Sequence, residues 1–168
     1  FADVGAADSQ ARSRRHSRFL TLICKATMEA LTGKWKVVGE EGSMSAFLTE
    51  RGVPLPVRKV LELMSKGGEF EFAIKDNAFC ETEIGMIRNT VKPPLPLDGS
   101  PQDVTTPSGD PCFTTCVWED GTLKITETMK ADSTDIVNQE IVVDGSTIKR
   151  TYTNKKTGTF FTGILNKI

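Results

Sequence analysis

The sequence contains a single histidine, His16, which lies near the N-terminus. Histidine is the usual general base near neutral pH and the commonest metal ligand, and residues 28–168 lack it altogether. Cys112 and Cys116 supply only two of the four ligands that a structural zinc site needs. We therefore predict a protein that is not an enzyme and that holds neither a metal ion nor another cofactor.

Long apolar runs are also missing. None approaches the ~20 residues of a membrane-spanning helix. The run FLTLIC near the N-terminus is shorter than the roughly 7–15 apolar residues at the centre of a signal peptide. On one extended strand, Cys112 and Cys116 would lie roughly 13 Å apart, too far for a disulfide. We expect reduced thiols and a cytoplasmic location.

Charge of either sign is nearly balanced, with a formal net charge of -1. The balance is uneven, because residues 1–27 carry a net charge of +3 and residues 28–168 therefore carry -4. A mildly acidic body argues against binding to nucleic acid. We predict that residues 1–27 are a disordered basic extension or one derived from a vector or gene model. A transit peptide is the open alternative. Residues 28–168 would form one folded domain.

The pattern of apolar residues becomes regular from Gly33 onward. The segment GKWKVVGE alternates like a strand, and SMSAFLTE and LPVRKVLELMS then show the three-to-four spacing of two short helices. After them, turn residues such as EDG and VDG recur every 8–12 residues or so between alternating segments, as in a barrel or sandwich. The sequence thus predicts an all-β fold, a ten-stranded antiparallel up-and-down β-barrel (β-clam) capped by a helix-turn-helix lid.

One segment, KPPLPLDGSPQDVTTPSGDP at residues 92–111, contains six prolines. Proline cannot donate a hydrogen bond to a strand ladder, so this segment predicts a gap or an edge in the barrel. The alternative is that PPLP is a ligand for a domain that recognises proline-rich segments.

Residues 28–168 resemble the intracellular lipid-binding proteins, the family of the fatty-acid-binding and cellular retinoid-binding proteins. MEALTGKWKVV resembles the family's first strand, RGVPLPVRKVLELM its second-helix region, and MIRNT a portal-loop motif in which Ile87 replaces the usual phenylalanine. The resemblance implies a ten-stranded barrel with two capping helices, a cavity and a gap between the fourth and fifth strands, where the prolines fall. It also implies a carrier for a fatty acid or retinoid.

The resemblance reveals one departure from the family pattern. Members that hold a carboxylate usually present Arg-x-Tyr inward from the last strand, and here those positions are Gly163 and Leu165. The family's third polar position falls near Ile141, or at Gln139 or Glu140 if the register slips. The usual carboxylate anchor is therefore missing.

The segment STIKRTYTNK repeats Arg-x-Tyr one strand earlier. Side chains alternate along a strand, so Arg150 and Tyr152 share a face with Ile148. A guanidinium group and a phenol hydroxyl can both donate hydrogen bonds to one carboxylate. We predict that the anchor has moved to Arg150 and Tyr152, with Gln139 as a third donor.

Two alternatives for this arginine stay open. A register shifted by one residue would turn Arg150 outward into solvent. Arg150 could also point inward and pair with Glu127 or Glu140, which would leave the cavity neutral and favour a less acidic ligand.

The remaining candidates for ligand contact are apolar residues or residues of the lid, each with an ordinary structural role as the alternative. They are Phe47, Val57, Arg58, Ile87, Ile141 and Leu165. Ile87 would gate the portal, and Arg58 with Lys59 would attract the lid transiently to an anionic membrane.

We expect a monomeric cytoplasmic carrier whose partner is one long-chain fatty acid, retinoid or similar hydrophobic small molecule. The rival hypothesis is a non-enzymatic interaction protein with a degenerate cavity, which acts through its proline-rich segment or its basic tail.

Overall fold

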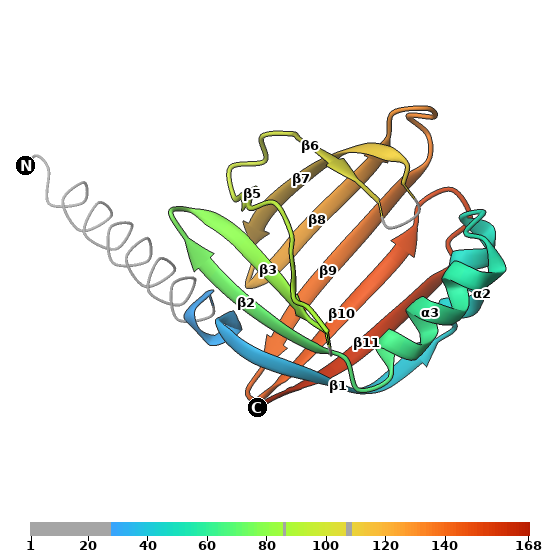
Figure 1. Cartoon of the computed structure of the whole chain (residues 1–168). Coiled ribbons are helices and arrows are strands. Elements are labelled where there is room, and N and C mark those ends of the chain that lie inside the picture. The colour runs from blue at the N-terminus through green and yellow to red at the C-terminus, as the bar shows by residue number, and fades with distance from the viewer. Residues whose placement is uncertain (1–27, 86, 107–108) are drawn as a thin grey trace, which may run out of the picture.

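The computed structural model describes residues 28–85, 87–106 and 109–168; the predicted N-terminal extension lies outside the described residues. A helical turn at residues 28–31 leads into a curled sheet and two helices (Figure 1). The elements are β1 (Gly33–Gly42), α2 (Met44–Glu50), α3 (Leu55–Ser65), β2 (Glu69–Lys75), β3 (Ala78–Ile84), β4 (Thr90–Val91), β5 (Leu95–Pro96), β6 (Gln102–Thr105), β7 (Pro111–Glu119), β8 (Thr122–Met129), β9 (Ile136–Asp144), β10 (Thr147–Asn154) and β11 (Phe160–Lys167).

The strands form one antiparallel sheet in the order β4-β3-β2-β1-β11-β10-β9-β8-β7-β6, and β5 pairs separately with β3. This up-and-down order confirms the predicted β-clam. The strand count differs by one, because the predicted fourth strand is split into two short pieces, β4 and β5. Pro93 and Pro94 lie between these pieces and have no N–H group to donate to a neighbouring strand. The two ends of the sheet, β4 and β6, are not paired, so the predicted gap lies where the proline-rich segment runs.

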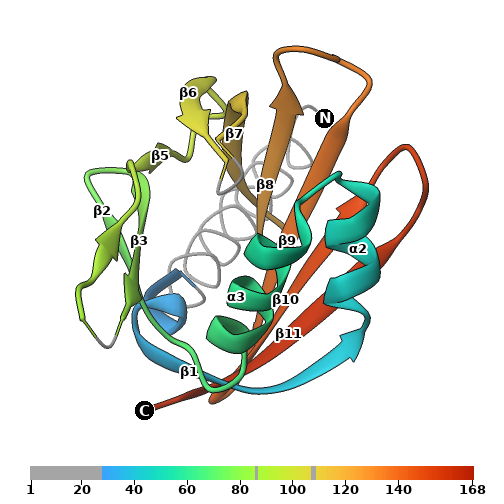
Figure 2. The same ribbon diagram turned by 45° about the vertical axis from the view of Figure 1, so that its right-hand side comes forward.

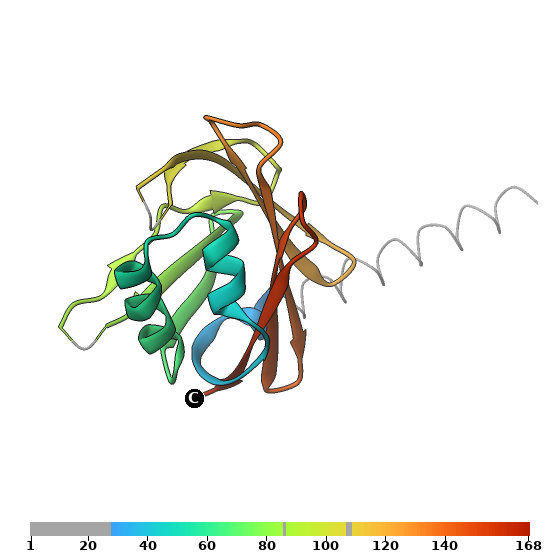
Figure 3. The ribbon, with the colours of Figure 1, turned by 90° about the vertical axis from the view of Figure 1, so that its right-hand side faces the viewer.

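The two helices lie side by side over one mouth of the curled sheet (Figures 2 and 3). The Ser43 side chain accepts a hydrogen bond from the Ala46 N–H at 3.1 Å and so caps the first turn of α2. Gly52 adopts a φ of +67°, a left-handed conformation that suits glycine at the end of a helix. Pro56 occupies the first turn of α3, where the N–H that proline lacks has no helical partner. The predicted lid is thus present.

Apolar side chains gather in two buried clusters at different depths of the sheet. The larger cluster contains Trp35, Phe72 and Phe79, and the Trp35 Nε1–H donates to the Leu31 carbonyl at 2.9 Å. The smaller cluster lies under α2 and joins Phe47 to Val137 and Phe161, with Met44, Leu48 and Tyr152 packed against it. Among the described residues, no helix is long and apolar enough to cross a membrane.

Candidate functional site

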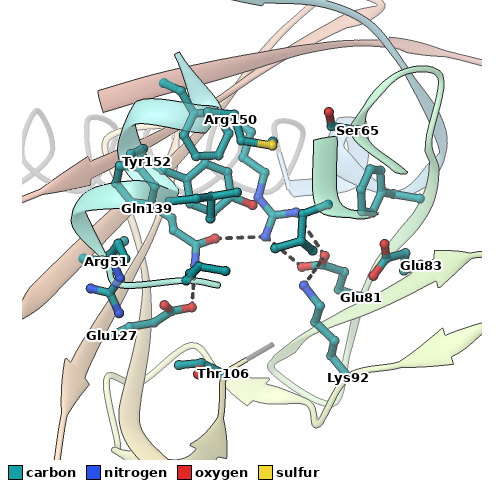
Figure 4. A pocket seen from close by; sticks show the side chains of 18 residues that line it. Arg51, Ser65, Glu81, Glu83, Lys92, Thr106, Glu127, Gln139, Arg150 and Tyr152 are labelled. Atoms are coloured by element: carbon teal, nitrogen blue, oxygen red, sulfur yellow. Dashed lines mark hydrogen bonds and ion pairs between the residues drawn. The ribbon is translucent and has the colours of Figure 1, made fainter. Parts of the chain in front are cut away.

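A cavity of about 230 Å³ lies between the lid and the inner face of the sheet (Figure 4). Its apolar lining comes from both sides, from Phe47 and Leu61 on the helices and from Phe70, Val137 and Phe161 on the strands. Polar and charged side chains line the rest of the cavity. They are Arg51, Ser65, Glu81, Glu83, Lys92, Thr106, Glu127, Gln139, Arg150 and Tyr152.

Arg150 is at the centre of the polar lining, because strand alternation turns it inward from β10. It lies opposite Ile141 on β9 and opposite Gly163 on β11, and only 5% of it is exposed. Its two terminal nitrogens donate to the two carboxylate oxygens of Glu81 on β3, each at 3.0 Å. This bidentate ion pair joins strands from the two sides of the cavity.

Glu81 is bound by a second cation. Lys92, in the chain that follows β4, donates to Glu81 Oε1 at 2.7 Å. Burial alone would raise the pKa of Glu81, but the positive charges of Arg150 and Lys92 outweigh it and lower this pKa to about 2. Glu81 is therefore a carboxylate at neutral pH, held between two cations.

The network continues from Arg150 toward β8. Arg150 also donates to Gln139 Oε1 at 2.9 Å, and Gln139 Nε2–H donates to Glu127 Oε1 at 2.6 Å. Figure 4 shows this chain of side chains running from Lys92 through Arg150 to Glu127. Burial raises the pKa of Glu127, because the carboxylate receives a neutral amide donor where Glu81 receives two cations.

Tyr152 forms the aromatic part of the lining. Its ring stacks on Phe161 with centroids 4.6 Å apart, and the Arg150 guanidinium lies 5.1 Å from its centroid. Phe47 of the lid meets both rings edge-on. Burial raises the pKa of Tyr152, so its hydroxyl keeps its proton at neutral pH. That hydroxyl forms no hydrogen bond with any residue that the structure describes, which leaves it available in the cavity.

The structure thus brings four of the predicted ligand-contact residues to the cavity: Phe47, Gln139, Arg150 and Tyr152. Arg150 points inward, as strand parity predicts. Its ion-pair partner is Glu81, and the two partners considered from sequence do not fill that role. Glu127 is connected only through Gln139, and Glu140 is exposed.

The structure does not bring the other five candidates to the cavity wall. Ile141 and Leu165 are buried in the larger apolar cluster and do not line the cavity, although Ile141 lies directly opposite Arg150. Val57 is half-buried on α3, and the half-buried Arg58 donates to the Thr49 hydroxyl of α2. Ile87 lies between β3 and β4, is 99% exposed and does not line the cavity.

Glu81 and Lys92 are the site residues that the sequence reasoning missed. Strand alternation in AFCETEI places Glu81 and Glu83 on the same face as Phe79, which is an apolar core position. Two carboxylates that follow a core phenylalanine at this spacing are a detectable signal for charge inside the barrel.

The lid is fastened to the sheet mainly through α2 and the residues next to it. Arg51 forms an ion pair with Asp135 at 2.8 Å, and Glu50 accepts hydrogen bonds from Thr157 and Thr159 at 2.7 Å each. Within the described residues, the side-chain hydrogen bonds of α3 go to α2 or stay inside α3. The helix α3 is therefore the part of the lid with fewer polar ties to the barrel.

The buried cysteines Cys112 and Cys116 lack the features of catalytic nucleophiles. Cys116 is 1% exposed and burial raises its pKa to about 12, whereas an activated thiol needs a lowered pKa. Among the described residues, no three histidine, cysteine, aspartate or glutamate side chains are grouped so that they could hold a metal ion. We expect iodoacetamide at pH 8 to alkylate half-buried Cys80 faster than Cys116, as measured by peptide mapping of the native protein. Equal alkylation rates for the two cysteines would contradict the burial of Cys116 in the core.

Comparisons with known proteins rest on structure alone, since no family model and no curated protein matches the sequence. Fatty-acid-binding protein 1 of Echinococcus granulosus is 22% identical, with a TM-score of 0.68 over 84% of this chain and 99% of that one. The Schistosoma mansoni fatty acid binding protein, solved with arachidonic acid, is 17% identical, with a TM-score of 0.72 over 84% and 98%.

Apo lipid binding protein 8 of Caenorhabditis elegans is also 17% identical, with a TM-score of 0.72 over 84% of this chain and 97% of that one. These likenesses cover nearly the whole length of the solved proteins and most of this chain. The chain therefore has the fold of the fatty-acid-binding proteins, as its sequence resemblance predicts.

Proposed function

We propose that this protein is a non-enzymatic carrier that binds one long hydrophobic molecule, such as a fatty acid, a retinoid or a similar lipid, between its lid and its sheet. The observation that carries the proposal is the cavity lined by Phe47, Phe161 and Val137 around an ordered polar network. The fold that the chain shares with fatty-acid-binding proteins supports the same function.

Binding would draw on two kinds of contact. Burial of the ligand's apolar chain contributes about 25 cal/mol per Å², and polar groups such as the Tyr152 hydroxyl would fix the orientation of its polar end. The cavity, at about 230 Å³, is smaller than the roughly 300–1,000 Å³ of typical ligand sites. We therefore expect α3, the helix with fewer polar ties to the barrel, to move outward when a long ligand enters, on the ~μs–ms timescale of such motions.

The rival function, an interaction protein, keeps one supporting observation. Pro93 and Pro94 are exposed, so a partner could reach the PPLP segment. The space that the side chains leave between the lid and the sheet favours the carrier.

Native mass spectrometry of the full chain, purified from its own source or an expression host, tests the carrier function. We expect a co-purifying lipid, bound one per chain, that organic extraction releases for identification. A protein that is free of ligand as purified and that also fails to load from a panel of long-chain alcohols, acids and retinoids would overturn the carrier proposal. It would favour the interaction protein.

A further inference from the structure

The cations that line the cavity are Arg51, Lys92 and Arg150, and each already has a carboxylate partner. Arg51 pairs with Asp135 at 2.8 Å, and Lys92 and Arg150 both pair with Glu81. A ligand carboxylate would need one of these cations as its counter-ion. Among the described residues that line the cavity, each cation is thus already paired, and the buried Arg150 directs both of its terminal nitrogens to Glu81.

Displacing Glu81 from Arg150 would be especially unfavourable. Glu81 is 4% exposed, and its two oxygens receive the two terminal nitrogens of Arg150. A ligand carboxylate on the same side of the guanidinium would push Glu81 away and leave a buried negative charge with Lys92 as its remaining cation. Removing one partner from a buried ion pair is among the most destabilising changes in proteins.

The cavity also contains two carboxyl groups that no cation contacts directly. Glu127 receives a hydrogen bond from the neutral Gln139 amide at 2.6 Å, and Glu83 lines the cavity; neither forms an ion pair with a described residue. Burial raises the pKa of Glu127, so this part of the cavity already disfavours negative charge, and an incoming carboxylate would meet the same penalty as it loses its own hydration.

Other polar groups in the cavity can accept an uncharged ligand end. The Tyr152 side chain lines the cavity, and its hydroxyl has no hydrogen-bond partner among the described residues. An alcohol oxygen accepts a hydrogen bond and donates another, so it can serve a donor such as Tyr152 and an acceptor such as Glu127 together. A carboxylate accepts but cannot donate.

We propose that the cavity selects lipids whose polar end is an uncharged hydroxyl over the carboxylates of the same chain length. The proposal rests on the carrier function proposed above and names the chemical class of its ligand. In this arrangement Glu81 is the specificity-determining residue, because it occupies the guanidinium that a carboxylate would otherwise use. Gln139 is a positioning residue, which links Arg150 to Glu127.

The test is a competition assay with the full chain at pH 7.4, in which 1-hexadecanol and hexadecanoate each displace one fluorescent long-chain lipid. We expect the alcohol to bind at least about tenfold more tightly than the acid, a difference of about 1.4 kcal/mol. Equal affinities, or tighter binding of the acid, would overturn the selectivity and leave the carrier function standing. Failure of both lipids, and of the probe, to bind would overturn both proposals.

Glu81→Gln supplies the second arm of the test. This variant keeps a side chain of nearly the same shape but leaves Arg150 without its carboxylate partner. The ratio of the affinity for the alcohol to the affinity for the acid should therefore fall at least about tenfold. Glu83→Gln is the matched control, because it removes the same charge from the same strand and cavity without freeing a cation. It should keep most of the preference for the alcohol, and a shift as large as that of Glu81→Gln would overturn the role of Glu81.

If Glu81→Gln is too unstable to purify without ligand, its thermal midpoint can be read in lysate with either lipid added. A ligand that binds the folded state raises that midpoint. We expect hexadecanoate to raise it more than 1-hexadecanol does, the opposite of the order in the unaltered protein. The same order in both proteins would overturn the proposal.

Discussion

Glu81→Gln is expected to lower the free energy of unfolding by about 3–5 kcal/mol, because it leaves the 5%-exposed Arg150 with a buried charge and no carboxylate. Urea denaturation at pH 7 measures the loss. The double variant Glu81→Leu/Arg150→Met is the control, since replacing both members of a buried ion pair with apolar side chains is often neutral or stabilising. A double variant as unstable as Glu81→Gln would show that the loss reflects packing and not an unpaired charge.

The same ion pair predicts a dependence of stability on pH. The pKa of Glu81 is lowered from 4.5 to about 2 on folding, so its contribution to stability is present above pH 4.5 and is lost as pH falls toward 2. We expect the stability of Glu81→Gln to fall less over this range than that of the unaltered protein. The raised pKa of Glu127 acts in the opposite direction above pH 4.5 and is present in both proteins, so it largely cancels in the comparison. Parallel pH profiles would contradict the assigned ion pair.

Phe47→Ala is expected to lower the stability of the fold and to speed the dissociation of bound ligand. Phe47 is 5% exposed and packs on Phe161, with ring centroids 5.1 Å apart, so its loss opens a cavity under α2 that costs about 3 kcal/mol. Because α2 fastens the lid to the barrel, we also expect bound lipid to dissociate at least about tenfold faster. Urea denaturation and stopped-flow release of a fluorescent lipid measure the two effects.

Leu63→Ala is the matched control for the lid. Leu63 lies on α3 and is 72% exposed, so its truncation should change stability by less than about 0.5 kcal/mol and leave the dissociation rate nearly unchanged. If Phe47→Ala released ligand no faster than Leu63→Ala, the part of the lid over Phe161 would not retain the ligand.

Much of the fold could be predicted from the sequence because its signals are local. Alternation along the strands, helical spacing in two short segments and turn residues at regular intervals each depend on neighbours in the chain. The prolines located the gap for the same reason. Their further effect, the division of one strand into β4 and β5, depends on which backbone groups face β3, and that is a property of the assembled sheet.

The site shows where such local reasoning stops. Strand parity alone places Arg150 inward, and Gln139 lies opposite Tyr152, so this part of the network follows from adjacent strands. Glu81 lies 69 residues from Arg150 in the chain, and the two strands meet only because the sheet curls around the cavity. The alternation of residues within each strand therefore does not predict the contact between Glu81 and Arg150. The ion pair therefore changes the predicted ligand end, from a carboxylate anchored by Arg150 to an uncharged hydroxyl.

The most direct test of the account is to locate a bound lipid in solution. Isotope-filtered NOESY spectra of the labelled full chain, saturated with unlabelled 1-hexadecanol, report which side chains lie beside the ligand. We predict contacts from the ligand chain to the rings of Phe47 and Phe161, and from the carbon that bears the hydroxyl to the ring of Tyr152. Contacts confined to exposed residues such as Leu63, with none to Phe47, Phe161 or Tyr152, would contradict a carrier that holds its ligand beneath the lid.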